Sequence, residues 1–242
     1  MRITLKLSLL IIFTYFQLQV YGQCSLDDIE LEQIEQKTIR KYLEHQIEEG
    51  KNQFYDIQPS WNRGDDLSLY NKNEMTFFLN ASIQDVWQSY LTINPSKLWN
   101  NRYLSKGLML QKLPERIFYN KNKFVYTDIG QVYFLNLKLL SGIYNIPIVF
   151  EITTIDASEM VIEFSYVKGN YSLGFQQIKF ITVDDNTTKI IHTSYFKSDS
   201  RFRDKWLYPF FHKRITKNFH KNVKRLLISE KPYVAQVDLD NK

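Results

Sequence analysis

The chain has four histidines, the side chains best suited to metal binding or to proton transfer near neutral pH: His45, His192, His212 and His220. None of them belongs to an HExxH or CxxC pattern. The spacing between His212 and His220 is too long for two ligands on adjacent turns of a helix. The sequence therefore predicts no metal site.

Two carboxylates and one histidine are candidates for acid–base chemistry, because Glu151, Glu163 and His192 stand in otherwise apolar strand-like segments. If one of them faced a dry cavity, its pKa would shift and it could act as an acid or a base. The plainer interpretation is that each faces water, since an antiparallel sheet usually has one solvated side. The chain also lacks the GxSxG, GxGxxG and GxxxxGK[ST] patterns. We therefore predict no catalytic residue and no cofactor, and keep an acid–base enzyme as the alternative.

The start of the chain has the pattern of an export signal. Arg2 and Lys6 precede an apolar run, and Val20 and Gly22 are small enough for the positions at which a signal peptidase cuts. Glutamines interrupt the run, which is shorter than the roughly 20 apolar residues that an uncleaved membrane anchor needs. We expect residues 1–22 to be a signal peptide and the protein to be exported, either to a periplasm or into the medium.

Cys24 is the only cysteine, so an internal disulfide is impossible and stability must come from packing. A lipid-modified N-terminal cysteine is the other interpretation of Cys24, but Gln23 and Tyr21 stand where a lipoprotein signal carries a small residue directly before the cysteine and usually Leu two positions earlier. Hydrophobic residues make up 44% of the chain and aromatic residues 15%, enough for a large core. We expect a monomer.

Charge is distributed unevenly. Residues 25–70 contain eleven acidic and five basic residues, a net charge of −6, whereas residues 201–225 contain nine basic residues and one acidic residue, a net charge of +8. The acidic arm could therefore dock on the basic helix, although solvated charged faces are the more ordinary explanation.

Local patterns divide the chain into an arm and a domain. In the arm, Ser25 and Asp28 form a capping box, an amphipathic helix follows and ends near Gly50, and residues 53–73 are an irregular linker. The domain opens with a strand over residues 74–79 and a helix that Ser82 caps, followed by a short helical piece at 95–101. An antiparallel meander is predicted next, with strands at 116–119, 124–129, 148–155, 160–167, 175–183 and 189–196. A long helix from residue 202 closes the domain.

This order of elements resembles the START-like superfamily, also called Bet v 1-like or polyketide cyclase/dehydrase and lipid transport (SRPBCC), over about residues 74–229. The segment Asn80–Trp87 looks like the family's strand-to-helix opening, and the closing helix carries Leu207, Phe211, Phe219 and Leu226. The resemblance implies an α+β helix-grip fold, in which a curved antiparallel sheet wraps around a long C-terminal helix. The resulting domains are a signal peptide (1–22), an acidic helical arm and linker (23–73), a START-like domain (74–229) and a C-terminal tail (230–242).

The closing helix has an apolar and a basic side. Leu207, Phe211, Ile215, Phe219 and Val223 recur every four residues, while Lys213, Lys217 and Lys221 lie on the opposite side. The resemblance implies that the apolar side lines a cavity, although a solid core would give the same pattern. The ligand-binding residues that we predict are Trp87, Tyr90, Phe164, Tyr166, Phe211, Ile215 and Phe219.

The resemblance favours an exported domain that binds a hydrophobic small molecule or lipid between the sheet and the last helix. Alternatives are an acid–base enzyme of the cyclase or hydratase type on the same scaffold, and an envelope-associated module that binds a protein through its charged surfaces. The basic face of the helix could also contact an anionic membrane, although simple solvation of that face is the plainer interpretation. Nucleic acid is not an expected partner, because the basic stripe lacks a recognisable binding motif.

Overall fold

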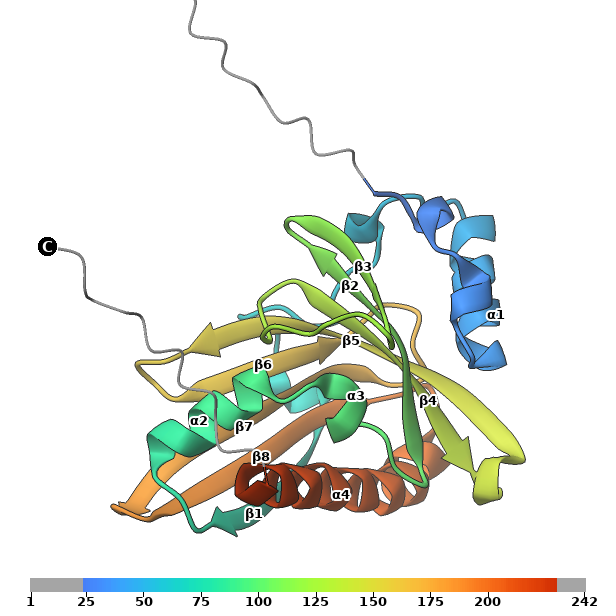
Figure 1. The fold of residues 1–242 in the computed structure, drawn as a ribbon. Coiled ribbons are helices and arrows are strands. Elements are labelled where there is room, and N and C mark those ends of the chain that lie inside the picture. Colours follow the sequence, from blue (N-terminus) through green and yellow to red (C-terminus); the bar gives the residue numbers. More distant parts are fainter. Residues whose placement is uncertain (1–23, 230–242) are drawn as a thin grey trace, which may run out of the picture.

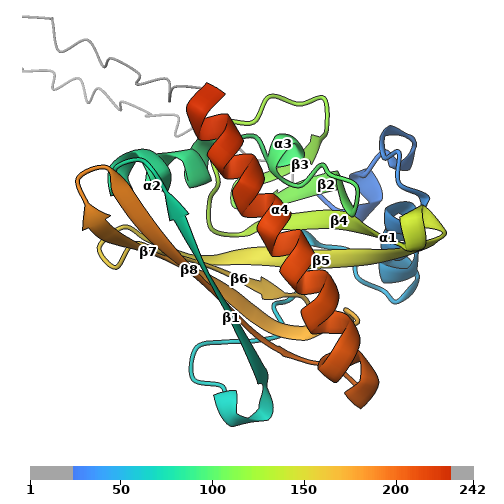
Figure 2. The same cartoon turned by 90° about the horizontal axis from the view of Figure 1, so that it is seen from below.

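The computed structural model describes residues 24–229, which form an eight-stranded, fully antiparallel sheet and a long C-terminal helix that crosses one of its faces (Figures 1 and 2). The strand order is β1-β8-β7-β6-β5-β4-β2-β3. The strands are β1 (Asn71–Leu79), β2 (Leu104–Lys112), β3 (Glu115–Tyr119), β4 (Gln131–Leu139), β5 (Tyr144–Asp156), β6 (Val161–Tyr166), β7 (Leu173–Asp184) and β8 (Thr187–Lys197). The predicted signal peptide and C-terminal tail lie outside the described residues.

Within residues 24–229, four α-helices accompany the sheet: α1 (Lys37–Glu48), α2 (Ile83–Thr92), α3 (Pro95–Leu98) and α4 (Tyr208–Ser229). The single turns are η1 (Leu26–Asp28), η2 (Leu31–Gln33), η3 (Phe54–Asp56), η4 (Leu67–Leu69), η5 (Leu140–Gly142) and η6 (Arg203–Leu207), of which η6 is π-helical. No helix among the described residues is both long and apolar enough to span a membrane. The α+β helix-grip fold predicted from the resemblance is confirmed.

Helix starts follow the predicted capping chemistry. Ser82 accepts a hydrogen bond from the backbone N–H of Asp85 at 3.2 Å, which fixes the first turn of α2 directly after β1. Ser25 and Asp28 form the predicted capping box, although it caps the short turn η1 rather than the long helix of the arm. That helix, α1, ends beside Gly50, whose positive φ of 82° suits glycine.

The sheet separates two hydrophobic cores. On one face, α2, α3 and α4 bury a core around Phe150, Phe164 and Phe180. On the other face, the N-terminal arm buries a second core around Phe54 and Phe134. The arm is therefore packed against the sheet through apolar side chains and is more than a tether. Because α1 packs on β4 and β5 from the face opposite to α4, the acidic arm does not dock on the basic helix (Figure 1).

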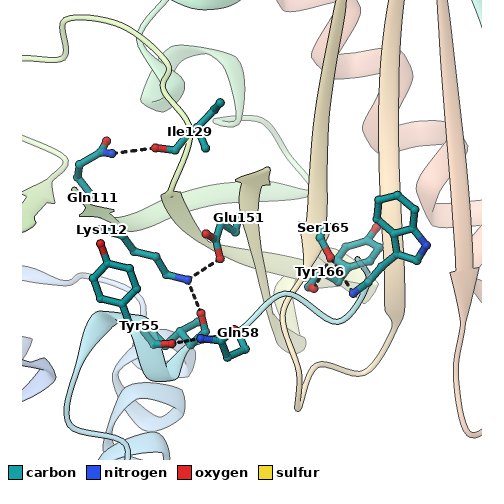
Figure 3. A network of polar contacts seen from close by, with 10 residues as sticks. Tyr55, Gln58, Gln111, Lys112, Ile129, Glu151, Ser165 and Tyr166 are labelled. Carbon is teal, nitrogen blue, oxygen red and sulfur yellow. Dashed lines mark hydrogen bonds and ion pairs between the residues drawn. The ribbon is translucent and has the colours of Figure 1, made fainter. Parts of the chain in front are cut away.

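A buried ion pair within the sheet also holds the arm through one of its two members (Figure 3). The Lys112 ammonium group lies 2.6 Å from a Glu151 carboxylate oxygen and donates a second hydrogen bond to the backbone carbonyl of Ile57 at 2.7 Å. Further along the arm, Trp61 donates its backbone N–H to the hydroxyl of Ser165. These contacts fix the predicted linker in place on the sheet.

Part of the predicted meander was wrong. Residues 124–129 are not a strand, and the hairpin partner of β3 is β2, which pairs Leu108 with Tyr119 and Lys112 with Glu115. Strands β2 and β4 were not predicted. Every residue of β2, and the first seven of β4, are buried on both sides of the sheet, so these strands lack the alternation that identifies a half-exposed strand.

Candidate functional site

A hollow of about 300 Å³ lies between the start of α4 and the strands β4, β5 and β6. Its walls are mostly apolar, with side chains from β4 and β5 opposite Leu207, Phe211 and Ile215 of the closing helix. The polar residues that line it include Tyr166, Tyr208, His212 and Arg203. This size and this composition are typical of sites that hold small apolar molecules, for which cavities of roughly 300–1,000 Å³ are common.

A smaller hollow of about 40 Å³ lies next to it, deeper under α4. Ile148, Tyr166, His212 and Ile215 line both hollows. The smaller one reaches Phe150, Phe164, Phe219 and Trp99, which belong to the main hydrophobic core. The larger hollow therefore ends inside the protein at a wall that is aromatic on one side and polar on the other.

Part of the polar side of this wall, His212 and Thr216, comes from a polar stripe of α4 that was not predicted. His212, Thr216 and His220 follow one another every four residues, and all three are buried beside the apolar stripe. On the opposite side of the helix, the lysines at 213, 217 and 221 are exposed, as predicted. Four-residue spacing could have revealed the polar stripe, since i and i+4 share one helix face.

These side chains belong to one continuous hydrogen-bond network. Tyr90 of α2 lies 2.5 Å from His220 Nδ1, and His220 Nε2 lies 2.9 Å from His192 Nδ1. The other nitrogen of His192 contacts Gln176 Oε1 at 2.7 Å, and the same oxygen contacts His212 Nε2 at 2.8 Å. The network thus crosses from α2 through α4 to β8 and β7.

Gln176 also connects the histidines to the hydroxyls near the hollow. Its amide nitrogen donates a hydrogen bond to the Tyr166 hydroxyl at 2.6 Å, and that hydroxyl lies 2.8 Å from the hydroxyl of Tyr208. Tyr208 in turn contacts the hydroxyl of Ser194 at 2.8 Å. Because Tyr166 and Tyr208 line the hollow, a ligand there would meet one end of this network.

The hydrogen bonds determine which nitrogens carry protons. Gln176 Oε1 is an acceptor, so His192 and His212 must each donate from Nε2–H and accept at Nδ1. His220 therefore donates from its own Nε2–H to His192 Nδ1, and its Nδ1 accepts the proton of the Tyr90 hydroxyl. All three rings are neutral in this arrangement, with each Nδ1 occupied by a donor; for His212 that donor is the Asn73 amide, 3.4 Å away.

Burial opposes protonation of all three rings. Desolvation lowers the pKa of His212 to about 4. It also lowers the pKa of His220 to about 3, with a smaller contribution from nearby His212. The pKa of His192 lies well below its ordinary value, chiefly through burial and then through the neighbouring His220 and His212. A proton-transfer group works best with a pKa near the operating pH, so these histidines are better suited to a neutral structural network.

The histidines do not converge on a common point as metal ligands would. Their rings contact each other or Gln176 directly, and the ring centres of His192 and His220 are 5.1 Å apart. Among the described residues, no group of three His, Cys, Asp or Glu side chains is placed to hold a metal ion.

Five of the seven predicted ligand-binding residues line the hollows. Tyr166, Phe211 and Ile215 line the larger hollow, and Phe164 and Phe219 line the smaller one. Whether they contact a ligand stays a prediction.

The other two predicted residues, Trp87 and Tyr90, line neither hollow. Both pack edge-on against Phe180 of β7, with ring centres 5.5 and 4.8 Å away, because α2 lies under the far half of α4. The segment from Leu137 to Ile148 also forms a cavity wall, which was not predicted because β4 and the start of β5 lack a clear strand pattern in the sequence.

The carboxylates considered for acid–base chemistry lie on the other face of the sheet. Glu151 is paired with Lys112, and burial raises the pKa of Glu151 although the lysine partly opposes this shift. Glu163 forms an ion pair with Arg63 at 3.3 Å and accepts a hydrogen bond from Gln177. Of the described residues, no Asp or Glu lines either apolar hollow.

A third, polar hollow of about 580 Å³ lies between the start of α1, the loop after α3 and the ends of β2, β4 and β5. Lys106 is its most buried charged residue, with 6% of its surface exposed, and burial lowers its pKa to about 8. Its ammonium group donates to the Asn120 side chain at 3.2 Å, and no carboxylate among the described residues pairs with it.

Comparison with solved structures agrees with this architecture. Norcoclaurine synthase of Thalictrum flavum, a point mutant in complex with a transition-state analogue, superimposes with a TM-score of 0.50 and 11% sequence identity, over 67% of this chain and 96% of that one. An aromatase/cyclase of Streptomyces sp. R1128 gives a TM-score of 0.49 and 10% identity, over 69% and 98% of the two chains. Ara h 8.0201 gives 0.48 and 9%, over 66% and 99%.

These neighbours are Bet v 1-like (SRPBCC) proteins, as the sequence resemblance predicted, and at this low identity the likeness shows the fold alone. No family model and no curated protein matches the sequence.

Proposed function

We propose that this protein binds an apolar small molecule or lipid in the larger of the two apolar hollows, the one of about 300 Å³ under the start of α4. The observation that carries the proposal is the hollow itself, because about 300 Å³ of mostly apolar space remains under a helix whose neighbouring turns are tightly packed. Burial of hydrocarbon contributes about 0.8 kcal/mol per methylene group, so a chain of about ten methylenes would gain about 8 kcal/mol before the costs of binding.

The polar end of the hollow gives the ligand its orientation. The hydroxyls of Tyr166 and Tyr208 are held by their own hydrogen bonds, and His212 stands beside them as a neutral ring. A ligand with one hydroxyl, carbonyl or carboxylic acid group and a hydrocarbon body fits this distribution. Export is the second part of the proposal, and it rests on the signal-like pattern of residues 1–22.

Two experiments test the proposal: identification of a molecule that copurifies with the protein, and a substitution that fills the cavity. Native mass spectrometry of the mature chain, followed by organic extraction, should identify a stoichiometric apolar molecule, and medium-chain fatty acids should raise the melting temperature. Ile215→Trp should abolish that increase, because Ile215 lines both hollows. Ile228→Trp is the matched control, since Ile228 lies on the same helix and is 76% exposed. Equal responses of the two variants would contradict the proposed site.

An acid–base enzyme on the same scaffold is the second candidate, favoured by the contact of His212 and Tyr166 with the hollow. It requires a bound molecule to be converted. If the wild type is incubated with the bound molecule and releases it chemically unchanged, under conditions in which the free molecule is stable, the result favours binding alone. A reaction product that the wild type forms and the His212→Gln variant does not form would favour the enzyme.

A further inference from the structure

Exposed apolar side chains gather in the three segments that surround the larger hollow. They come from the turn between β4 and β5, the turn before β7 and the start of the closing helix: Leu140, Ile143, Tyr144, Tyr171, Phe202, Trp206, Leu207 and Phe210. We call this set the mouth ring. Tyr171 and Leu207 themselves line the hollow, and the other members stand within a few residues of lining residues. The mouth ring therefore borders the cavity.

The degree of exposure is unusual for large side chains. Ile143 is 82% exposed, Phe202 63% and Trp206 61%, and the mouth ring supplies eight of the eighteen large hydrophobic residues that are exposed in the described part of the chain. Scattered exposed apolar residues are ordinary on a protein surface, but a gathered set marks a place of interaction.

Cations are interleaved with these aromatic rings. Residues 201–210 contain three Lys and Arg residues and one Asp, a net charge of +2, and Arg214 follows one helical turn after Phe210. The Arg214 guanidinium lies 3.4 Å from the centre of the Phe210 ring, and the Lys205 ammonium lies 5.7 Å from that of Trp206. Tryptophan and tyrosine beside lysine and arginine are the side chains favoured where hydrocarbon meets charged lipid headgroups.

We propose that the mouth ring docks the protein on an anionic lipid bilayer, so that the cavity opens onto the membrane. The proposal rests on the proposed function, because docking there has a purpose only if an apolar ligand enters or leaves through the mouth. The exposed rings would enter the headgroup region, while the adjacent cations would meet anionic lipids and so strengthen binding. This surface is the cavity end of the helix, not the basic face of Lys213, Lys217 and Lys221.

Trp206 provides a built-in reporter. Trp61 and Trp87 are buried and Trp99 is partly buried, whereas Trp206 is exposed, so a change in fluorescence on membrane contact comes chiefly from Trp206. The full mature chain should bind vesicles of phosphatidylcholine with 30% phosphatidylglycerol. On binding, its emission should shift to the blue and be quenched by brominated lipid.

The decisive variant is Trp206→Asp/Phe210→Asp, which should weaken vesicle binding, followed by flotation, at least tenfold. Both side chains are exposed, so the melting temperature should stay close to that of the wild type. Phe78→Asp is the matched control, because Phe78 is 54% exposed on β1, outside the mouth ring, and its variant should bind vesicles as the wild type does. An equal loss in both variants, or no loss in the double variant, would overturn the proposal.

Two further outcomes separate docking from ligand binding. Ile215→Trp should lose the thermal response to fatty acid but keep vesicle binding, since Ile215 lies in the cavity wall and not in the mouth ring. A wild type that binds fatty acid but no vesicles would overturn the docking and leave the proposed function intact. The mouth ring could instead pair two copies of the chain. In that case light scattering would show a dimer that Phe210→Asp dissociates, and the wild type would not bind vesicles. This result would also overturn the proposal.

Discussion

The buried histidines predict a steep loss of stability in mild acid. An unfolded histidine has a pKa of about 6.5, whereas the folded pKa is about 4 for His212, about 3 for His220 and well below 6.5 for His192. Their pKa values are lowered by folding, so the unfolded chain binds more protons below pH 6.5. The stability that they contribute is therefore fully present above pH 6.5 and is lost as the pH falls toward 4.

The magnitude follows from these shifts. At pH 5, which is about 1.5 units below the pKa of an unfolded histidine, protonation stabilises the unfolded chain by about 2 kcal/mol per histidine, at about 1.36 kcal/mol per unit. The folded state does not share this gain, because its histidines stay neutral. His212 and His220 together give a loss of about 4 kcal/mol relative to pH 7, a large part of the total stability of an ordinary domain. The lowered pKa of His192 acts in the same direction, and the raised pKa of Glu151 acts in the opposite direction.

Urea denaturation at half-unit steps from pH 7 to pH 5 measures this loss. The matched variant is His220→Gln, because a glutamine amide can donate to His192 and accept from Tyr90 without titrating. Its slope of stability against pH should be smaller than that of the wild type by about one proton, or about 1.4 kcal/mol per pH unit. A wild-type stability that is flat between pH 7 and pH 5 would refute the buried neutral network.

Two further predictions concern buried lysines. Lys112→Met should lower the free energy of unfolding by about 3 to 5 kcal/mol, because it leaves the Glu151 carboxylate buried without its partner. Lys112→Met/Glu151→Leu should recover most of this loss, and a double variant as unstable as the single one in urea denaturation would contradict the account. Lys106→Met should stabilise the protein by about 1 to 3 kcal/mol at pH 7, because folding lowers the pKa of Lys106 from 10.5 to about 8 and so disfavours its charged form. This gain should shrink as the pH rises from 8 to 10.5, and a Lys106→Met variant less stable than the wild type at pH 7 would contradict the account.

The sequence by itself predicted the general architecture and the inward face of the last helix. Capping residues such as Ser82 act within a few residues, and the repeat of Phe211, Ile215, Phe219 and Val223 places one helix side toward the core whatever the rest of the fold. Local interactions of this kind can be read directly from residue types and spacing.

The tertiary structure alone decided where the hollow lies and which polar groups reach it. The histidine network joins α2, β7, β8 and α4, residues up to 130 positions apart, and no spacing pattern records such contacts. The side of the sheet to which Glu151 and Glu163 point depends on strand register, since a shift of one residue reverses every side chain. The cavity, finally, is the space left where packing is incomplete, and that depends on all of its walls together.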